Sequence, residues 1–304
     1  MVRVGTTPLR LMAIKYGADI VYSPEIIDRR LMRSQRIVNH KLGTIDYVDD
    51  QGIVNLRIHP KEKGRLVAQI GTANPEFALQ AAKMIQDDVD GVDVNCGCPK
   101  KFSVQGGMGS ALLETPDLLE SILSTLVSSL SIPVTCKIRL LSPKDGKSSL
   151  QRTTELIQRL EKTKVEAIAI HCRFVDDRPH VPAKWDVLQS LAQAVQIPVI
   201  ANGDVWSIAS VRDLQRLAPS VSSFMFARGA LDNVSHFNGA EARHISLILK
   251  EYVDSAVECG MDCSNVKYTL LQMWQCRDGI DFRNKLVKIK SLDDIKQFIE
   301  TYEF

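Results

Sequence analysis

The chain has 304 residues, of which 45% are hydrophobic and 24% are charged, and its formal net charge is +2. This composition is that of an ordinary globular protein, and the length suffices for one large α/β domain with a small appendage. The overall charge gives no argument for a polyanionic partner. No run of about 18 apolar residues occurs, which excludes a membrane-spanning helix.

The seven cysteines favour an intracellular protein with reduced thiols. Their number is odd, they are scattered through apolar segments, and no signal peptide is visible at the N-terminus. Cys96 and Cys98 have no second Cys or His pair at zinc-finger spacing, so we expect no metal site. We expect the protein in the cytoplasm, with the nucleus as a further location.

The N-terminal part is predicted to mix helices and strands. A helix is predicted to begin at Thr6-Thr7-Pro8 and to end at Gly17, because Thr caps helices, Pro suits the first turn and Gly ends them. Residues 19–23 predict a short strand. The basic residues 29–41 hold five Arg or Lys and no acid, and we expect them to be helical. Residues 53–58 alternate, which predicts a hairpin with the segment that follows.

Strands and helices then alternate regularly. The predicted strands are residues 66–71, 91–97, 133–140, 167–173, 198–204 and 223–229, and the predicted helices are residues 75–86, 116–130, 148–162, 183–195 and 207–217. The strands are rich in Val, Ile and Ala without strict alternation, as in parallel sheets buried on both faces. No Gly-x-Gly-x-x-Gly motif supports an open dinucleotide-binding sheet, so we predict a (β/α)₈ TIM barrel.

The alternation stops near residue 237. Residues 240–259, 265–275 and 291–304 are predicted to be helices. We therefore predict a barrel domain at residues 1–237 and a small helical domain at residues 238–304. The helical domain contains a second basic stretch, residues 283–290, with four Arg or Lys and no acid. Taken alone, each basic stretch is most simply a solvated helix face.

Polar residues follow the predicted strands at their carboxyl ends, which meet at one face of a barrel and carry its chemistry. They are Gln69, Asn95, Cys98, Lys137, Arg139, His171, Arg173, Asn202, Asp204 and Arg228. Lys137 interrupts an apolar strand, which is costly unless its ammonium meets an anion or a polar ligand atom. A flavin is a ligand that these residues could share, because its ring needs amide and cationic partners.

The loops after the last two strands have the composition of a phosphate site. Asn202-Gly203-Asp204 precedes a helix, and Arg228 lies between small residues. Backbone N–H groups and a guanidinium suit a phosphate dianion, and these loops frequently bind one in barrels. The alternative for Arg228 is a surface salt bridge.

Cys98 is the candidate for chemistry among the thiols. It precedes a proline and borders the glycine-rich residues 106–109, a loop that could close over a substrate. A thiol there can act as a general acid that gives a proton to carbon opposite the flavin. Cys96, Cys136 and Cys172 are interpreted as buried structural thiols.

Five motifs resemble one family in the same order along the chain. They are NCGCPKKFSVQGGMGSALL, PVTCKIR, IAIHCR, IPVIANGD and FMFARGA. They resemble the flavin-dependent tRNA-dihydrouridine synthases, and most of all the eukaryotic branch that acts on the D-loop uridine at position twenty. The resemblance extends from Met1 to the last helices. It implies FMN as cofactor, NADPH or NADH as electron donor and tRNA as partner, with no obligate protein partner evident.

The resemblance also implies residue roles. The implied flavin-binding positions are Met1, Val2, Gln69, Lys137, His171, Asn202, Gly203, Asp204, Ala227 and Arg228. Asn95 and Arg139 match positions near the uridine, and Cys98 matches the proton donor. In the implied cycle a nicotinamide nucleotide reduces FMN, which then delivers hydride to C6 of uracil while Cys98 protonates C5. The base must leave its stack for this.

The basic stretches gain a purpose from the same resemblance. They would contact tRNA phosphates, and Lys285, Lys288 and Lys290 are the positions we assign to this role. Animal members of the branch carry a C-terminal double-stranded-RNA-binding domain, and we expect none in this chain.

The family pattern places a first barrel strand just before Met1. The predicted strands number seven, whereas a closed barrel of this kind needs eight. We therefore expect either that Met1 is an internal methionine of a longer protein, or that the chain folds with an open seam between residues 19–23 and 223–229. A form extended upstream by about 10–20 residues would then be more soluble and retain more FMN.

Two other functions fit part of the sequence. A flavoenzyme acting on a free pyrimidine, as dihydroorotate and dihydropyrimidine dehydrogenases do, would share the barrel but leave the basic stretches and the helical appendage without a role. A non-catalytic tRNA-binding protein would not need the complete set of rim residues. Binding of tRNA tests the first alternative, and bound FMN tests the second.

Overall fold

The computed structural model describes residues 1–275, 277 and 280–304. Its first elements are α1 (Thr7–Lys15), β1 (Val21–Tyr22), β2 (Ile26–Ile27), α2 (Asp28–Leu31), β3 (Gln35–Asn39), β4 (Thr44–Val48), β5 (Val54–Ile58) and the 3₁₀ helix η1 (Pro60–Glu62). The regular alternation follows as β6 (Leu66–Gly71), α3 (Pro75–Ile85), β7 (Gly91–Cys96), α4 (Lys101–Gln105), η2 (Gly109–Glu114), α5 (Pro116–Ser129), β8 (Val134–Arg139), α6 (Ser149–Lys162) and β9 (Ala167–His171). It ends with η3 (Trp185–Val187), α7 (Leu188–Gln193), β10 (Val199–Asn202), α8 (Ile208–Leu217), β11 (Ser223–Met225), α9 (Arg228–Asp232) and η4 (Val234–Asn238).

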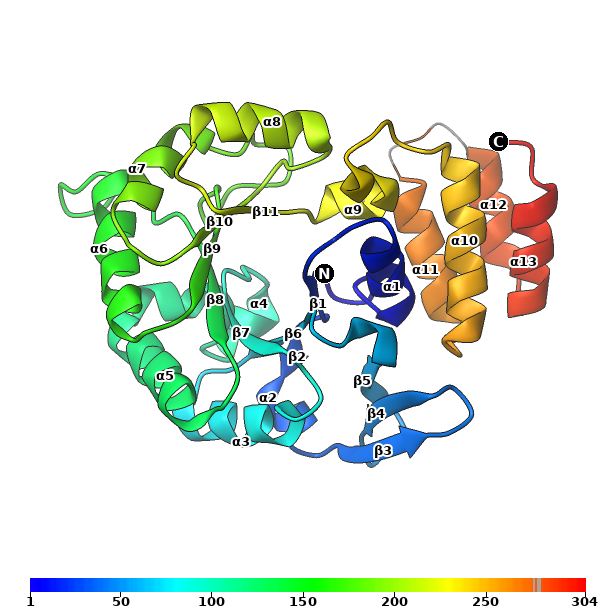
Figure 1. Cartoon of the computed structure of the whole chain (residues 1–304), viewed down its shortest axis with the longest axis horizontal. Helices are drawn as coiled ribbons and strands as arrows, with labels where there is room; N and C mark the ends of the chain where they lie inside the picture. Colours follow the sequence, from blue (N-terminus) through cyan, green and yellow to red (C-terminus); the bar gives the residue numbers. More distant parts are fainter. Residues whose placement is uncertain (276, 278–279) are drawn as a thin grey trace.

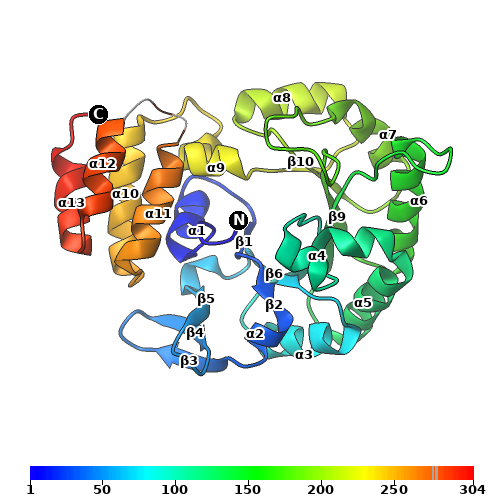
Figure 2. The same cartoon turned by 180° about the vertical axis from the view of Figure 1, so that it is seen from behind.

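A parallel sheet organises the molecule. Its strands follow one another in the order β1-β6-β7-β8-β9-β10-β11, with β2 also paired to β6. The sheet curls, and α3, α5, α6, α7 and α8 lie outside it (Figures 1 and 2). This confirms the predicted TIM-barrel architecture, in the incomplete form that the strand count suggested.

The register of the sheet aligns the polar strand residues in layers. Asn95 lies opposite Lys137, and Arg139 lies opposite His171, which in turn pairs with Asn202. Residues two apart on a strand face the same side. The layers therefore bring the polar side chains of neighbouring strands together inside the mouth of the barrel.

The barrel is open at one seam. Within the described residues, β1 and β11 end the sheet and do not pair with each other. Helix α1 lies beside this seam and packs against η4 and α10 (Figure 1). Gly17 permits this approach, because its φ is +109° and an added Cβ would lie 3.0 Å from the carbonyl oxygen of Phe237. Helices α1 and α10, with η4, therefore pack together beside the gap between β1 and β11.

The helices covering the sheet begin as their sequences predict. The Asn74 side chain accepts a hydrogen bond from the Phe77 N–H at 2.9 Å and caps α3. Ser148 and Gln151 form a capping box at the start of α6. Apolar residues spaced three and four apart on these helices face the sheet, as with fully buried Ala78, Ala82 and Ile85 of α3. These contacts fix the strand ends on which the site is built.

The predicted helix at residues 29–41 is wrong. Only α2 is helical there, and β3 pairs antiparallel with β4 over its whole length. Ile37 and Val38 have β-branched side chains that suit a strand, and pairing outweighs the weak helix propensity of the stretch. Its basic residues are also partly neutralised: Arg36 forms an ion pair with Asp88 at 2.7 Å.

The hairpin predicted for residues 53–58 forms with a different segment from the one expected. β5 pairs with the preceding β4, not with the segment after it. Asp49 explains this, because its carboxylate accepts hydrogen bonds from the N–H groups of Gln51 and Ile53, and Gly52 has φ +76°. This Asx turn reverses the chain before β5 begins.

Several predicted elements are shorter in the structure. The helix at residues 183–195 is divided into η3 and α7, and Trp185 of η3 donates its indole N–H to the carbonyl of Gly203 at 2.9 Å. The strand at residues 223–229 ends at Met225, and Arg228 already begins α9.

Four helices follow the barrel. They are α10 (Ile245–Glu258), α11 (Cys263–Met273), α12 (Ile280–Lys288) and α13 (Leu292–Thr301). An aromatic cluster joins the last three of them and the residues that end the chain, and it is made of Trp274, Phe282, Phe298, Tyr302 and Phe304. The boundary at residues 237 and 238 stays a prediction. No helix among the described residues is both long and apolar enough to cross a bilayer.

Candidate active site

A buried carboxylate orients the amide of Gln69. Asp93 accepts hydrogen bonds from Gln69 Nε2 at 2.8 Å and from Thr135 Oγ1 at 2.7 Å. The Gln69 Oε1 atom is left as an acceptor and lies 3.5 Å from Asn95 Nδ2. Burial raises the pKa of Asp93 to about 6, although the hydrogen bonds from Gln69 and Thr135 act to lower it. The sequence reasoning missed Asp93, although an acidic residue within an apolar strand was a visible signal.

Lys137 lies one layer above, opposite Asn95. Burial lowers the pKa of its ammonium to about 8, and the nearby Asp93 carboxylate opposes this shift. A group with this pKa is still mostly protonated at neutral pH. Lys137 therefore places a cation in the lining of the barrel mouth, and its binding of a ligand stays a prediction.

The chain around Cys98 fixes the position of its thiol. The buried Ser103 hydroxyl donates to Cys98 Sγ at 3.3 Å, and the Ser110 N–H donates to the Cys98 carbonyl at 3.0 Å. Gly109 has φ +61°, and a Cβ there would lie 2.5 Å from that carbonyl oxygen. Only glycine fits, so the predicted glycine-rich loop holds Cys98 rather than merely covering it.

The thiol opens into a cavity that continues to the seam. This cavity measures about 610 Å³, a size typical of ligand pockets. Besides Cys98, its predicted site residues are Met1, Val2, Gln69, Asn95, Lys137, Arg139, His171, Asn202 and Ala227. The other three thiols of the sheet, those of Cys96, Cys136 and Cys172, are fully buried, and burial raises the pKa of each.

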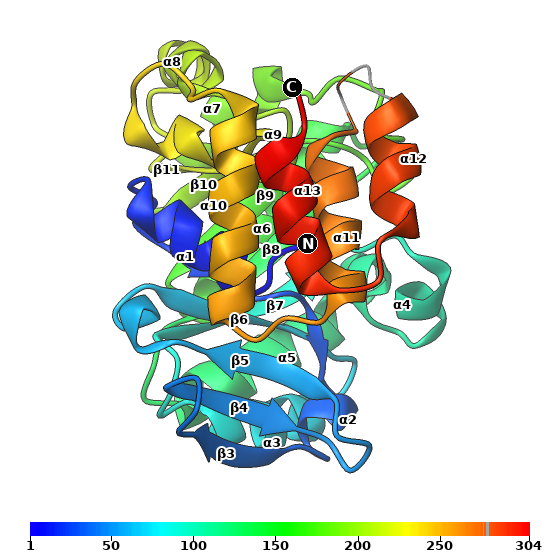
Figure 3. The same cartoon turned by 90° about the vertical axis from the view of Figure 1, so that its right-hand side faces the viewer.

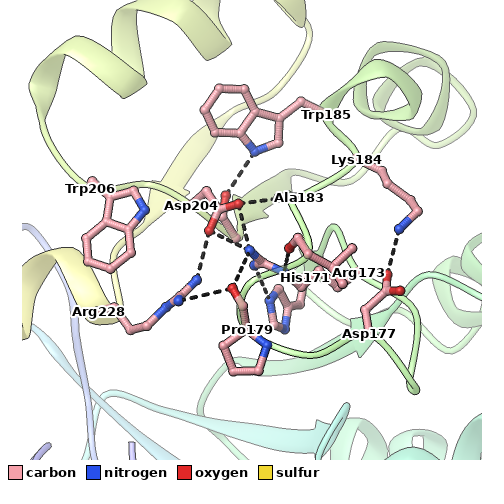
Figure 4. Close-up of polar contacts among 12 residues, drawn as sticks. His171, Arg173, Asp177, Pro179, Ala183, Lys184, Trp185, Asp204, Trp206 and Arg228 are labelled. Carbon is pink, nitrogen blue, oxygen red and sulfur yellow. Dashed lines mark hydrogen bonds and ion pairs between the residues drawn. The ribbon is translucent and has the colours of Figure 1, made fainter.

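Two arginines and Asp204 form the centre of a second cavity of about 540 Å³ (Figure 4). Arg173 Nη2 lies 2.6 Å from both carboxylate oxygens of Asp204, and Arg228 Nη2 lies 2.8 Å from one of them. The Arg228 guanidinium also lies over the Trp206 ring, 4.8 Å from its centroid. Burial works to raise the pKa of Asp204, but the hydrogen bonds and charge of Arg173 lower it overall.

The geometry changes the interpretation of two residues. Asp204 was expected to bind the flavin, which stays a prediction, and its carboxylate contacts the two arginines. Arg173 was not among the expected binding residues, yet it is only 3% exposed and lines the same cavity. Gly203, with φ +110°, lets the chain pass between Ala183 and His171, each 3.1 Å from where a Cβ would stand.

His171 is a neutral hydrogen-bond acceptor. Its Nε2 lies 3.2 Å from Arg173 Nη1, and a guanidinium can only donate. The imidazole proton is therefore on Nδ1. Burial lowers the pKa of His171 to about 2, and the cations Lys137, Arg139 and Arg173 add to this effect.

This pKa predicts an acid-sensitive fold. Below the ordinary histidine value of 6.5, the unfolded chain binds a proton that folded His171 does not. Stability is therefore lost as pH falls below that value, by about 1.4 kcal/mol per pH unit for this group. Between about pH 6.5 and pH 5, His171→Gln should lose about 2 kcal/mol less stability than the wild type in urea titrations of the flavin-free protein. Parallel pH dependence in the two proteins would contradict the assignment.

The three predicted tRNA-binding lysines lie outside both cavities, on and just after α12. Lys285 forms an ion pair with Asp281 at 2.8 Å and lies over the Tyr302 ring. Lys288 and Lys290 are exposed. In Figure 3, α12 projects from the same side of the molecule as α4, the helix next to Cys98. The basic helix and the helix next to Cys98 thus lie on one side of the molecule.

The family model described as "Dihydrouridine synthase (Dus)" matches residues 1–292. The chain belongs to this family. It is 37% identical to the "tRNA-dihydrouridine(20) synthase [NAD(P)+]" of Schizosaccharomyces pombe, over 99% of this chain and 64% of that protein. It is 41% identical to the Saccharomyces cerevisiae protein of the same name, over 71% of this chain and 58% of that one. The chain therefore spans about three fifths of the length of these dihydrouridine synthases.

Among solved structures, the 2-naphthoyl-CoA reductase complex shares the fold of this dihydrouridine synthase family member. The TM-score is 0.51 at 11% sequence identity, covering 78% of this chain and 46% of that chain. At this identity the likeness concerns the architecture alone. It agrees with the curled parallel sheet described above.

Proposed function

We propose that this protein is a tRNA-dihydrouridine synthase that reduces the C5=C6 bond of a D-loop uridine, at position 20 as in the names of its two yeast relatives. The observation that carries the proposal is the placement of Cys98. Its thiol is anchored at the mouth of a cavity that also contains Asn95, Arg139 and Lys137. A proton donor thus adjoins amide and cationic groups suited to a pyrimidine.

The residues of the two cavities fit FMN. Gln69 presents an amide oxygen whose direction Asp93 fixes, and Lys137 presents an ammonium. Arg173 and Arg228 lie side by side where a phosphate dianion would be met by charge-assisted hydrogen bonds. When bound, FMN supplies the hydride for the uracil ring, replenished by NADPH or NADH as the names of the relatives indicate.

The chain's own residues then have separate tasks. Asn95 accepts the Gly97 N–H on Oδ1 at 3.0 Å, and its Nδ2, which lies 3.5 Å from Gln69 Oε1, has a second hydrogen that can be donated to a uracil carbonyl. Arg139 is anchored by the carbonyls of Gly97 and Phe174, both at 2.8 Å, and brings positive charge to the mouth. Cys98 gives its proton to C5 on the ring face opposite the hydride.

The direct test supplies the FMN-loaded protein with NADPH and an unmodified tRNA transcript. Dihydrouridine is expected at one D-loop position, together with NADPH consumption that depends on tRNA. A free pyrimidine such as uracil or orotate should not replace the tRNA. Reduction of the free base at a comparable rate would favour the alternative flavoenzyme, and a flavin-free protein that only binds tRNA would favour the second alternative.

The basic end of α12 provides a separate prediction. Replacing Lys285, Lys288 and Lys290 with alanine should weaken tRNA binding and reduce its salt dependence, because each lost phosphate contact lowers the logarithmic slope by about 0.7–0.9. Lys285 is paired with Asp281 and should contribute least. Fluorescence anisotropy over a salt series measures the slope, with Lys162→Ala, Lys164→Ala and Lys83→Ala combined as a matched control. An unchanged slope would make this surface a solvated helix face only.

A further inference from the structure

The short helix α4 has two unlike sides. Phe102 is 60% exposed, more than any other aromatic residue of the chain, and Val104 is 40% exposed. Ser103, between them, is fully buried and bonds the Cys98 thiol. An aromatic ring is thus displayed one residue away from the group that contacts the proposed proton donor.

Backbone contacts fix the position of the short helix that carries this ring. The Gly106 N–H donates to the Phe102 carbonyl at 3.2 Å, and the Met108 N–H donates to the Ser103 carbonyl at 2.8 Å. Together with the Ser103–Cys98 hydrogen bond, these contacts attach α4 to the loop that carries the thiol. A ligand that touches Phe102 would therefore lie next to the mouth of the active-site cavity.

The charge around the ring indicates what kind of ligand this is. Lys100 and Lys101 are both exposed and directly precede Phe102. Among the residues that the structure describes, no carboxylate lies within ion-pair distance of either lysine. An exposed aromatic ring beside unpaired cations is the combination that binds unpaired nucleotides, by stacking on the base and by contacts to its phosphates.

We propose that Phe102 stacks on an unpaired RNA base next to the reduced uridine, with Lys100 and Lys101 on the adjoining phosphates. The proposal rests on the proposed function. A uridine that enters the cavity must leave its stack, which exposes the face of a neighbouring base. Phe102 then takes the place of the lost stacking partner. The surface is defined as Lys100, Lys101 and Phe102 and does not include α12.

The test compares three variants of the FMN-loaded full chain. Phe102→Ala should weaken binding of an unmodified tRNA transcript by about 5- to 150-fold, the range expected for the loss of one stacked base. Phe102→Trp should bind within about twofold of the wild type, because indole also stacks. Val104→Ala is the matched control on the same helix and should change nothing. All three should keep flavin content, melting temperature and tRNA-independent flavin reduction by NADPH.

A second ligand separates stacking from charge. A blunt RNA duplex exposes no unstacked base within its length, so Phe102→Ala should bind it as tightly as the wild type does. The double variant Lys100→Ala with Lys101→Ala should bind both the tRNA and the duplex more weakly. Binding of tRNA by Phe102→Ala within about twofold of the wild type would overturn the proposal. So would an equal loss in Val104→Ala, which would indicate that the helix as a whole, and not stacking on Phe102, supports tRNA binding. Failure of the wild type itself to bind tRNA would instead refute the proposed function.

Discussion

Cys98→Ala is expected to lower dihydrouridine formation by about 10²–10⁴-fold, the usual loss when a general acid is removed. The thiol is the one reactive group that the structure anchors at the cavity mouth, through Ser103 and the glycine-rich loop. Hydride transfer without a proton for C5 would leave a carbanion next to a carbonyl. The step should therefore be limited by protonation and not by flavin reduction.

Two measurements distinguish this role from a structural one. Flavin reduction by NADPH, followed by the bleaching of the flavin absorbance, should keep its rate in Cys98→Ala. Cys263→Ala is the control, because Cys263 is also a free, partly exposed thiol but lies at the start of α11. Near-normal tRNA reduction by Cys98→Ala would contradict the assignment, as would an equal loss in the control.

Arg173→Met should produce the largest loss of flavin. Arg173 is 3% exposed and makes hydrogen bonds to the Asp204 carboxylate and to the carbonyl of Val181. Its removal takes one charge from the proposed phosphate site and leaves Asp204 with Arg228 alone. We expect the purified variant to lack FMN, and the free energy of unfolding to fall by about 3 kcal/mol, near the lower limit for a broken buried pair because Asp204 stays partly exposed.

The two consequences can be separated by a second substitution. Asp204→Asn in the Arg173→Met background removes the carboxylate that has lost its buried partner and should recover part of the stability, whereas FMN should still be lost. Arg216→Met is the control, since Arg216 pairs with Asp213 on an exposed helix face. Full flavin content in Arg173→Met would place the phosphate site elsewhere. An equal loss of stability in the control would show that burial of the Arg173–Asp204 ion pair is not the cause of the loss.

The barrel was predictable because its signals are local. Apolar runs ending in polar residues located β6 to β11, and the polar residues within and just after these strands made Cys98, Lys137 and Arg228 candidates directly. The contacts that orient these residues were not predictable. That Asp93 bonds Gln69, or that Asp204 joins Arg173 to Arg228, depends on the register of neighbouring strands and on a loop conformation with positive φ at Asp204.

The errors at residues 29–41 and 53–58 have a related cause. A basic stretch with weak helix propensity forms β3 because β4 offers an edge to pair with, and the Asp49 side chain decides the direction of the hairpin. Tertiary pairing and a single Asx turn outweigh patterns that are read over short windows.

The open seam gives the sheet two ends, where a closed barrel has none. β1 pairs with β6 at only two positions and β11 with β10 at three, whereas β7 and β8 pair at five. Such a sheet can open strand by strand from its ends, so backbone amides near the seam should exchange with solvent first and those of β7 and β8 last. Gln69 lies on β6, next to one end of the sheet, and Arg228 follows β11, at the other end. A ligand that contacts both residues would hold the two ends of the sheet together. A substitution that weakens cofactor binding should therefore also make the sheet open more readily at the seam.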